Sequence, residues 1–338
     1  MQKVKLQILS ELINSSKSFW DLLADNNFLL KDFIDALTSL HNDGLITFDG
    51  SSFKLTEKGR KTINEKLGLF KSEICKSCLG KRVMFNGEFK EVFEEFKKIV
   101  KNRPDPTINF FQGYMKEYDV VARVAFMHLN NDLYNKSFVL IGDDDLLSIA
   151  LSLTGLPSRI CVLDVDERLG EYLKKINQKY NFEIEFYKYD VSEPLPENLI
   201  NQFDVFSSEP LESESGLKAF IERGIYCLKN GGAGYFGLTT AEASFQKWLK
   251  IEKFLTKMNC VITDIIKSFS RYPMNYTTVN YEEFVRKLQF PIKPNPGVEW
   301  YKSTLFRFEI LKKPKKIINR KLRIEYVDFK EDFTYPSF

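Results

Sequence analysis

The chain has 338 residues with 43% hydrophobic and 28% charged side chains and a formal net charge of +3, a composition typical of a globular protein of about two or three domains. The nearly balanced charge argues against nucleic-acid binding by bulk electrostatics, and no run of about 18 apolar residues predicts a membrane span. The first residues lack the apolar core of a signal peptide and the five cysteines do not form a disulfide framework, so we expect a cytoplasmic protein.

Residues 1–68 are predicted to form a small module of three helices and a hairpin. The turn and capping signals place helices at about 4–13, 18–23 and 30–41, and strands at 45–48 and 53–56. This order resembles a winged helix. The helix that would read DNA offers Lys31 beside Asp32 and Asp35, which suits phosphate contacts poorly. We therefore expect a packing or dimerisation module and no nucleic-acid partner.

Residues 69–107 are predicted to be a linker that carries Cys75-Lys76-Ser77-Cys78 and a charged helix at about 88–101. One CxxC pair supplies only half of a tetrahedral zinc site, and no second pair follows at a usable spacing. A redox role and a vestigial zinc knuckle stay open, and we predict no metal site. The other three cysteines fall in apolar patterns and are expected in the core.

Residues 108–312 are predicted to form one Rossmann-like α/β domain. Strands are expected at 137–141, 159–164, 184–187, 203–208 and 231–238, alternating with helices, and two long antiparallel strands at 261–269 and 304–311 complete the series. Parallel strands followed by an antiparallel pair are typical of the class I methyltransferase sheet. Ligands of such sheets bind at the carboxyl ends of the strands.

The segment just before the first strand of this domain often lies across the cofactor in nucleotide-binding transferases. Gln112 and Tyr114 are therefore candidates for substrate contacts. The alternative is that Tyr114 belongs to the core together with Phe110 and Phe111.

The most informative stretch is the strand at 137–141 followed by Gly142, Asp143, Asp144 and Asp145. Nucleotide-binding turns usually carry several glycines that let the backbone approach a phosphate. Three carboxylates repel phosphate, so we expect a cationic ligand. The alternative is that these acids cap the following helix, but one cap needs only one acid.

Acids also follow the next three strands. Asp164 and Asp166 lie about 20 residues beyond Gly142, the usual distance to the acid that binds a ribose. Asp190 ends the third strand, and Glu209 and Glu212 follow the fourth. The sequence thus predicts one acidic crevice, with Gly142, Asp143, Asp164, Asp166 and Asp190 holding the nucleoside co-substrate.

The charge of this crevice favours decarboxylated S-adenosylmethionine over S-adenosylmethionine, because the two differ by one carboxylate. Two unit charges about 4 Å apart interact by roughly 4 kcal/mol at an effective dielectric constant near 20. An acidic crevice also suits a polyamine acceptor, for which Asp144 and Glu212 are candidate ligands. No cofactor beyond the co-substrate is expected.

The reaction predicted for such a pair is displacement at the carbon next to the sulfonium, with methylthioadenosine as the leaving group. Neither His41 nor His128 lies in the sheet region, so carboxylates must orient the amine and accept its proton. We predict Asp145 and Glu209 as the catalytic residues. For Glu209 the alternative is a loop that merely ends a strand.

The tail, residues 313–338, is basic at first and then acidic and aromatic. Such a segment is predicted to be flexible and disordered in the free chain. The alternative is that it folds over an active site that holds a polyamine.

Several motifs together resemble the branched-chain polyamine synthase, or N(4)-bis(aminopropyl)spermidine synthase, family. They are Phe-Gln-Gly-Tyr-Met at 111–115, Ile-Gly-Asp-Asp-Asp-Leu at 141–146, Val-Leu-Asp-Val-Asp-Glu-Arg-Leu at 162–169, Gly-Tyr-Phe-Gly-Leu-Thr at 234–239 and Trp-Tyr-Lys-Ser at 300–303. The resemblance implies successive transfer of two aminopropyl groups to the secondary amine of spermidine.

One motif departs from this family, which usually has Asp-Pro-Pro-Glu where this chain has Glu209-Pro210-Leu211-Glu212. The extra methylene of Glu209 keeps the charge but moves it, so the acceptor or the number of transfers is open. Two other functions stay as alternatives: an S-adenosylmethionine-dependent N-methyltransferase acting on nucleic acid, and a non-enzymatic winged-helix regulator. A homodimer is expected because it is common for this fold type.

Overall fold

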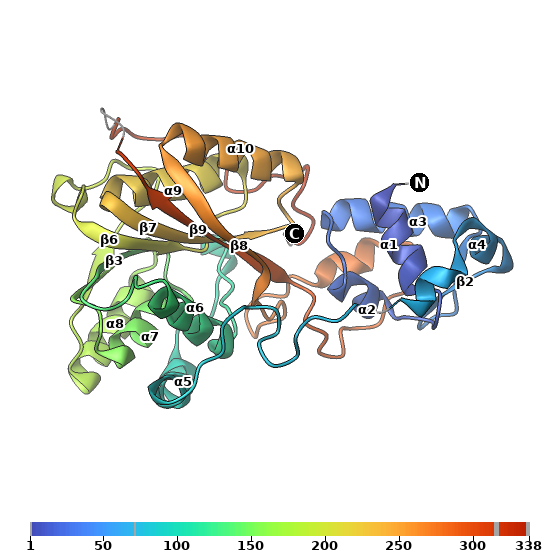
Figure 1. Cartoon of the computed structure of the whole chain (residues 1–338), viewed down its shortest axis with the longest axis horizontal. Helices are drawn as coiled ribbons and strands as arrows, with labels where there is room; N and C mark the ends of the chain where they lie inside the picture. The colour runs from blue at the N-terminus through green and yellow to red at the C-terminus, as the bar shows by residue number, and fades with distance from the viewer. Residues whose placement is uncertain (1, 71, 314–317, 336–338) are drawn as a thin grey trace.

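The computed structural model describes residues 2–70, 72–313 and 318–335. Figure 1 shows two parts side by side: an N-terminal module in blue, and a larger domain built on a twisted sheet. The linker crosses from one part to the other. Within the described ranges, no helix is long and apolar enough to cross a membrane.

The N-terminal module has the predicted order of helices and strands, although the winged-helix assignment itself stays a prediction. Its elements are α1 (Lys3–Glu11), α2 (Phe19–Ala24), α3 (Leu30–Asn42), β1 (Ile46–Phe48), β2 (Phe53–Leu55), α4 (Glu57–Thr62) and the 3-10 turn η1 (Glu65–Leu69). Ser18 caps α2 by accepting a hydrogen bond from the Asp21 amide, as the polar residue before the apolar run predicted.

The sheet domain also has its predicted elements within a few residues. It comprises α5 (Glu88–Ile99), η2 (Val100–Asn102), η3 (Ile108–Phe110), α6 (Glu117–Leu129), β3 (Ser137–Ile141), α7 (Leu147–Thr154), β4 (Arg159–Asp164), α8 (Glu167–Tyr180), β5 (Ile184–Lys188), η4 (Glu197–Leu199), β6 (Phe203–Ser208), α9 (Glu214–Cys227), β7 (Leu228–Thr239), α10 (Phe245–Lys257), β8 (Cys260–Arg271), η5 (Glu283–Lys287) and β9 (Lys302–Ile310).

The seven strands of the large sheet run in the order β5-β4-β3-β6-β7-β9-β8. The first five are parallel, whereas β9 pairs antiparallel with both β7 and β8. The order reverses direction between β3 and β6, which creates a crevice at the carboxyl ends of these strands. The predicted α/β fold with a class I methyltransferase-like sheet is confirmed.

Both faces of this sheet are covered, which explains why its central strands are continuous apolar runs. Helices α5 to α8 lie below the sheet in Figure 1, and α9 and α10 lie above it. Along β3, Phe138 and Leu140 belong to one core and Val139 and Ile141 to the other.

The connection between β8 and β9, residues 272–301, joins the two parts of the molecule. Its aromatic rings pack on the N-terminal module: Phe284 lies 6.4 Å from both Phe19 and Trp20, measured between ring centroids. The Trp20 indole also donates a hydrogen bond to the Lys293 carbonyl (2.9 Å). The N-terminal module therefore packs against this connection and supports it, in agreement with the packing role expected for the module.

The described tail residues, 318–335, lie across the carboxyl ends of the strands. The Leu322 amide donates to the Ser192 carbonyl (2.7 Å), and the Ser244 amide donates to Glu331 (2.8 Å). Lys247 on α10 pairs with Asp328 (3.0 Å) and Glu331 (3.2 Å). The prediction of a disordered tail is thus corrected toward its alternative, because the acids of the tail find a buried lysine.

Candidate active site

A cavity of about 380 Å³ lies at the carboxyl ends of the parallel strands, between the sheet, the 272–301 connection and the tail. Residues that line it include Phe110, Phe111, Gln112, Gly142, Asp144, Asp164, Asp190, Glu209, Glu212, Phe220, Glu242, Lys247, Tyr272, Tyr281, Tyr301, Ser303, Tyr326, Asp328, Asp332 and Thr334. Most of the predicted site residues therefore come together.

The three aspartates after β3 have three different environments. Asp143 accepts hydrogen bonds from the Ser148 amide and hydroxyl in the first turn of α7. Asp145 is 5% exposed and accepts from the Met115 amide. Only Asp144 lines the cavity, where it also accepts from the Gly113 amide (3.1 Å). The expectation that all three face one ligand is corrected, since two of them hold the loop.

Of the acids that follow β4 and β5, some line the cavity and one instead caps a helix. Asp164 and Asp190 line the cavity, and Asp164 accepts from the backbone amides of Asp143 (3.0 Å) and Asp166 (2.8 Å). Asp166 instead caps α8 through the Arg168 amide and pairs with its guanidinium (2.7 Å), outside this cavity. Its predicted contact with a ribose is therefore replaced by a structural role.

The segment before α6 supplies one of its two predicted pocket residues. Gln112 lines the cavity, and its amide donates to Asp166 (2.9 Å). Tyr114 does not reach the cavity; it packs against Tyr276 (4.9 Å between centroids) and lies under the Arg103 guanidinium (4.1 Å). Tyr114 is half-buried outside this cavity, and its contact with substrate stays a prediction.

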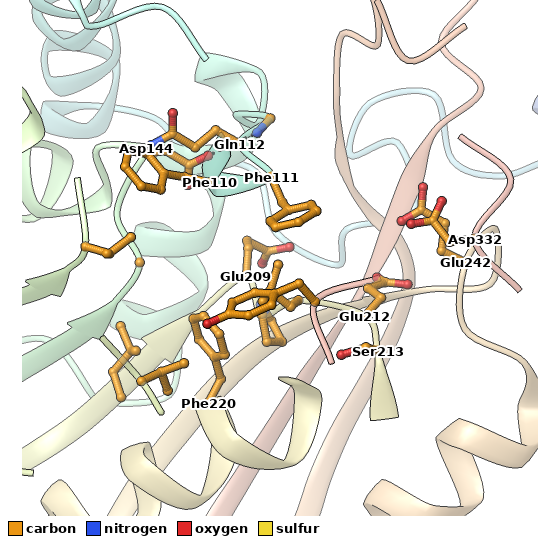
Figure 2. A pocket seen from close by; sticks show the side chains of 18 of the residues that line it. Phe110, Phe111, Gln112, Asp144, Glu209, Glu212, Ser213, Phe220, Glu242 and Asp332 are labelled. Atoms are coloured by element: carbon orange, nitrogen blue, oxygen red, sulfur yellow. Dashed lines mark hydrogen bonds between the residues drawn. The ribbon is translucent and has the colours of Figure 1, made fainter. Parts of the chain in front are cut away.

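Glu209 lies at the centre of the cavity, between Asp144 and Glu212 (Figure 2). Its carboxylate pairs with the Arg123 guanidinium of α6, which is 1% exposed, and accepts a hydrogen bond from the Tyr272 hydroxyl. A Cβ atom at Gly237 would lie 1.9 Å from this carboxylate, so only glycine fits there. These contacts argue against the alternative that Glu209 belongs to a loop that only ends a strand.

A second group of acids forms the end of the cavity opposite Asp144. Glu212, Glu242 and Asp332 gather there in Figure 2. The Thr239 amide donates to one oxygen of Glu212 (2.7 Å), while its buried Oε2 has no hydrogen-bond partner. One cation lies beside them: the Lys247 ammonium donates to the backbone carbonyls of Glu212 (3.1 Å) and Glu242 (3.2 Å), and it pairs with Asp328 and Glu331. The three carboxyl groups therefore outnumber the positive charge at this end of the cavity.

Burial controls the protonation of these acids. It raises the pKa of Glu242 to about 8, together with repulsion from Asp332. Burial also raises the pKa of Glu212 well above its usual range, with repulsion from Glu242 next in size. On the other side, burial raises the pKa of Asp164 to about 6 and that of Asp144 in the same direction. A bound cation would reverse these shifts.

These shifts predict a specific pH dependence of stability. Because the pKa of Glu242 is raised from 4.5 to about 8, its stabilising contribution is complete below about pH 4.5 and is lost as the pH rises through 8. One pKa unit corresponds to about 1.4 kcal/mol. We expect the unliganded chain to melt several degrees lower at pH 9 than at pH 6, and Glu242→Gln to reduce this difference. Equal melting temperatures at both values would contradict it.

Tyr272 and Glu242, which line the cavity, and Arg123, which pairs with Glu209, were not identified from the sequence. They come from a strand end, a loop and a helix that carry no local motif. The tail, which the sequence predicts to be disordered, instead places Tyr326 on Phe111, with 5.9 Å between ring centroids and 7° between planes.

The fold and the cavity define a Rossmann-like transferase whose ligand site is acidic at both ends. A family model described as the Branched-chain polyamine synthase A C-terminal domain matches residues 91–333. The chain is 39% identical to an N(4)-bis(aminopropyl)spermidine synthase of Thermococcus kodakarensis, over 88% of this chain and 85% of that protein. A Methanocaldococcus jannaschii protein of the same name is 37% identical, over 90% and 87%.

One solved structure extends the similarity to the whole fold. It is the branched-chain polyamine synthase of Thermus thermophilus, in complex with N4-aminopropylspermidine and 5'-methylthioadenosine. It superposes with a TM-score of 0.80 and 28% identity, covering 96% of this chain and 92% of that one. The chain belongs to the branched-chain polyamine synthase family.

Proposed function

We propose that this protein transfers aminopropyl groups from decarboxylated S-adenosylmethionine to the secondary amine of spermidine. The products are branched-chain polyamines and methylthioadenosine. The single observation that carries the proposal is the acidic end of the cavity, where the Glu212, Glu242 and Asp332 carboxyl groups outnumber the Lys247 ammonium beside them, which already pairs with Asp328 and Glu331. The names of the family's other members agree with it.

The nucleoside part of the donor is assigned to the end formed by β3, β4 and β5. Gly142, with φ 76°, lets the loop turn directly after β3. Asp164 lies at the position from which an acid binds a ribose, and Asp190 ends the next strand. The rings of Phe110, Phe111 and Phe220 line the cavity and offer apolar surface to the adenine and the thioether.

The acceptor is assigned to the opposite end. Glu212 and Glu242 bind the outer ammonium groups of the polyamine, and Asp332 on the tail adds a third charge. Asp144 remains on the donor side, where its carboxylate attracts the donor's ammonium and repels a carboxylate. Asp145, buried behind Asp144, positions the loop through Met115 rather than touching substrate.

The reaction needs an unprotonated acceptor amine in line with the carbon–sulfur bond. The nitrogen lone pair forms the new nitrogen–carbon bond while the carbon–sulfur bond breaks, and its electrons neutralise the sulfonium. After the first transfer the nitrogen must lose a proton, for which Glu209 is the nearest candidate. A second transfer to the resulting tertiary amine produces a quaternary nitrogen and releases no proton.

The test is direct. Purified protein is incubated with decarboxylated S-adenosylmethionine and spermidine. The products are separated by chromatography and identified by mass spectrometry. We expect methylthioadenosine and polyamines that carry one and then two added aminopropyl groups on the central nitrogen. Transfer only to a terminal amine, or transfer of a methyl group from S-adenosylmethionine, would refute the proposal.

Two further points remain proposals. We infer that the protein acts in the cytoplasm, which the free thiols of all five cysteines support. We also infer a homodimer, which is common for this fold type.

A further inference from the structure

Cys75 and Cys78 lie in the linker, outside the cavity, and the proposed reaction does not use them. Both thiols are free; that of Cys75 is exposed and that of Cys78 is partly exposed. The backbone amides of Ser77 and Cys78 donate hydrogen bonds to the Cys75 sulfur, and the two thiols contact each other. Amides directed at a sulfur are the contacts that orient thiolate ligands of metal ions.

The backbone after Cys78 turns back on itself instead of starting a helix. Leu79 and Gly80 both have positive φ, at 52° and 79°, and the next helix begins only at Glu88. Reactive redox pairs commonly sit at a helix N-terminus, whose field activates one thiol. This turn lacks that feature. Its C-x₂-C spacing and its reversal fit one half of a tetrahedral metal site.

The turn is also firmly attached to the sheet domain. Lys81 is fully buried: its ammonium pairs with Asp119 (3.0 Å), and its amide donates to the Cys78 carbonyl (2.8 Å). Arg82 pairs with Asp264 on the edge strand β8 (2.9 Å). The two sulfurs are therefore held in place before any metal arrives, which lowers the cost of binding.

One chain offers only half of the ligands. Within residues 2–70, 72–313 and 318–335, no group of three or more His, Cys, Asp or Glu side chains is arranged to hold a metal ion. A structural zinc site is almost always four-coordinate. Two sulfurs at the surface of one chain thus need two more from elsewhere, and a second copy of the same turn supplies an identical pair.

The surroundings of the turn suit contact between copies. Of the 19 large apolar side chains that are exposed in the described chain, six lie between residues 67 and 84. We call them the linker patch: Leu67, Leu69, Phe70, Ile74, Leu79 and Met84. Figure 1 shows this linker passing between the two parts of the molecule. Such a concentration of exposed apolar surface marks an interaction site.

We propose that Cys75 and Cys78 of two copies together bind one thiolate-preferring metal ion, such as Zn²⁺, and that the linker patch packs around it in the dimer. Each cysteine binds as its thiolate, and the proton that it loses goes to solvent. The proposal is independent of the aminopropyl transfer, because the site lies outside the cavity.

The experiment uses the full chain, stripped of metal and kept reduced under anaerobic conditions. Co²⁺ and, separately, Zn²⁺ are titrated while absorbance and molar mass by light scattering are recorded. We expect one metal ion per two chains, the charge-transfer bands of a four-thiolate cobalt site, and a shift from monomer to dimer that a chelator reverses. A one-to-one monomeric complex, or a dimer that forms equally well without metal, would overturn the proposal.

Matched variants locate the site. The Cys75→Ser/Cys78→Ser pair keeps the three buried cysteines and should weaken metal binding about a thousandfold or more. Lys76→Ser alters the same turn without removing a thiol and should bind like the parent chain. Leu69→Ser should keep the cobalt bands but weaken the dimer. Unchanged metal binding by the double serine variant, with its melting temperature retained, would refute the assignment.

Discussion

Replacing Glu209 by glutamine is expected to reduce both catalysis and stability. The Arg123 guanidinium is 1% exposed and would lose its only carboxylate partner among the described residues. Removing one member of a buried ion pair typically costs about 3–5 kcal/mol. In addition, the acceptor amine loses the carboxylate that lies between the donor and acceptor ends. We expect kcat/KM to fall by about a hundredfold or more, measured with a chromatographic assay of methylthioadenosine.

The stability and activity effects can be separated by a second replacement. Arg123→Met combined with Glu209→Gln removes both charges, and should recover much of the lost free energy of unfolding. It should not recover activity. If the double variant regains activity, Glu209 serves the fold alone.

Comparing the two successive transfers distinguishes two possible roles of Glu209, accepting a proton and orienting the amine. The first transfer, to spermidine, releases a proton, whereas the second, to N4-aminopropylspermidine, does not. A carboxylate that accepts this proton matters more for the first acceptor. One that only orients the amine matters equally for both, so the ratio of the two losses in the Glu209→Gln variant decides between these roles.

Replacing Glu212 or Glu242 by glutamine is expected to act mainly on acceptor binding. Each carboxylate faces the end of the cavity assigned to the outer ammonium groups. A hydrogen bond to a charged group contributes about 1.5–3 kcal/mol, so the KM for spermidine should rise by roughly tenfold to a hundredfold. The KM for the aminopropyl donor should change little.

Glu214→Gln provides the matched control for these variants. Glu214 lies two residues beyond Glu212, but it is exposed and pairs with Lys250 outside the cavity. Its replacement should leave both KM values unchanged. A KM for the donor that rises as much as that for spermidine in Glu212→Gln would place the donor, not the acceptor, at this end.

The fold was predictable because its signals are local. The apolar runs at 137–141 and 159–164 become β3 and β4, and their carboxyl ends necessarily meet at one edge of a parallel sheet. That geometry alone placed Asp144, Asp164 and Glu209 around one cavity. The family resemblance added the expected chemistry of the ligand, but not the position of any side chain.

The predictions that were wrong concern which side chains face the cavity, and this depends on the direction of the backbone over a few residues. Asp143, Asp144 and Asp145 are equivalent in the sequence, yet the loop between Gly142 and α7 directs only Asp144 into the cavity. Residues such as Tyr272 and Asp332 reach the cavity from segments far along the chain, and no single-sequence pattern reports contacts of that range.

The most direct test of the account is calorimetric titration with decarboxylated S-adenosylmethionine and, separately, with S-adenosylmethionine. An interaction of roughly 4 kcal/mol between the added carboxylate and Asp144 corresponds to about a thousandfold difference in affinity. We predict that the decarboxylated donor binds at least about a hundredfold more tightly, and that Asp144→Asn removes most of this preference. Equal or tighter binding of S-adenosylmethionine would contradict selection by charge and would make a methyltransferase the better description.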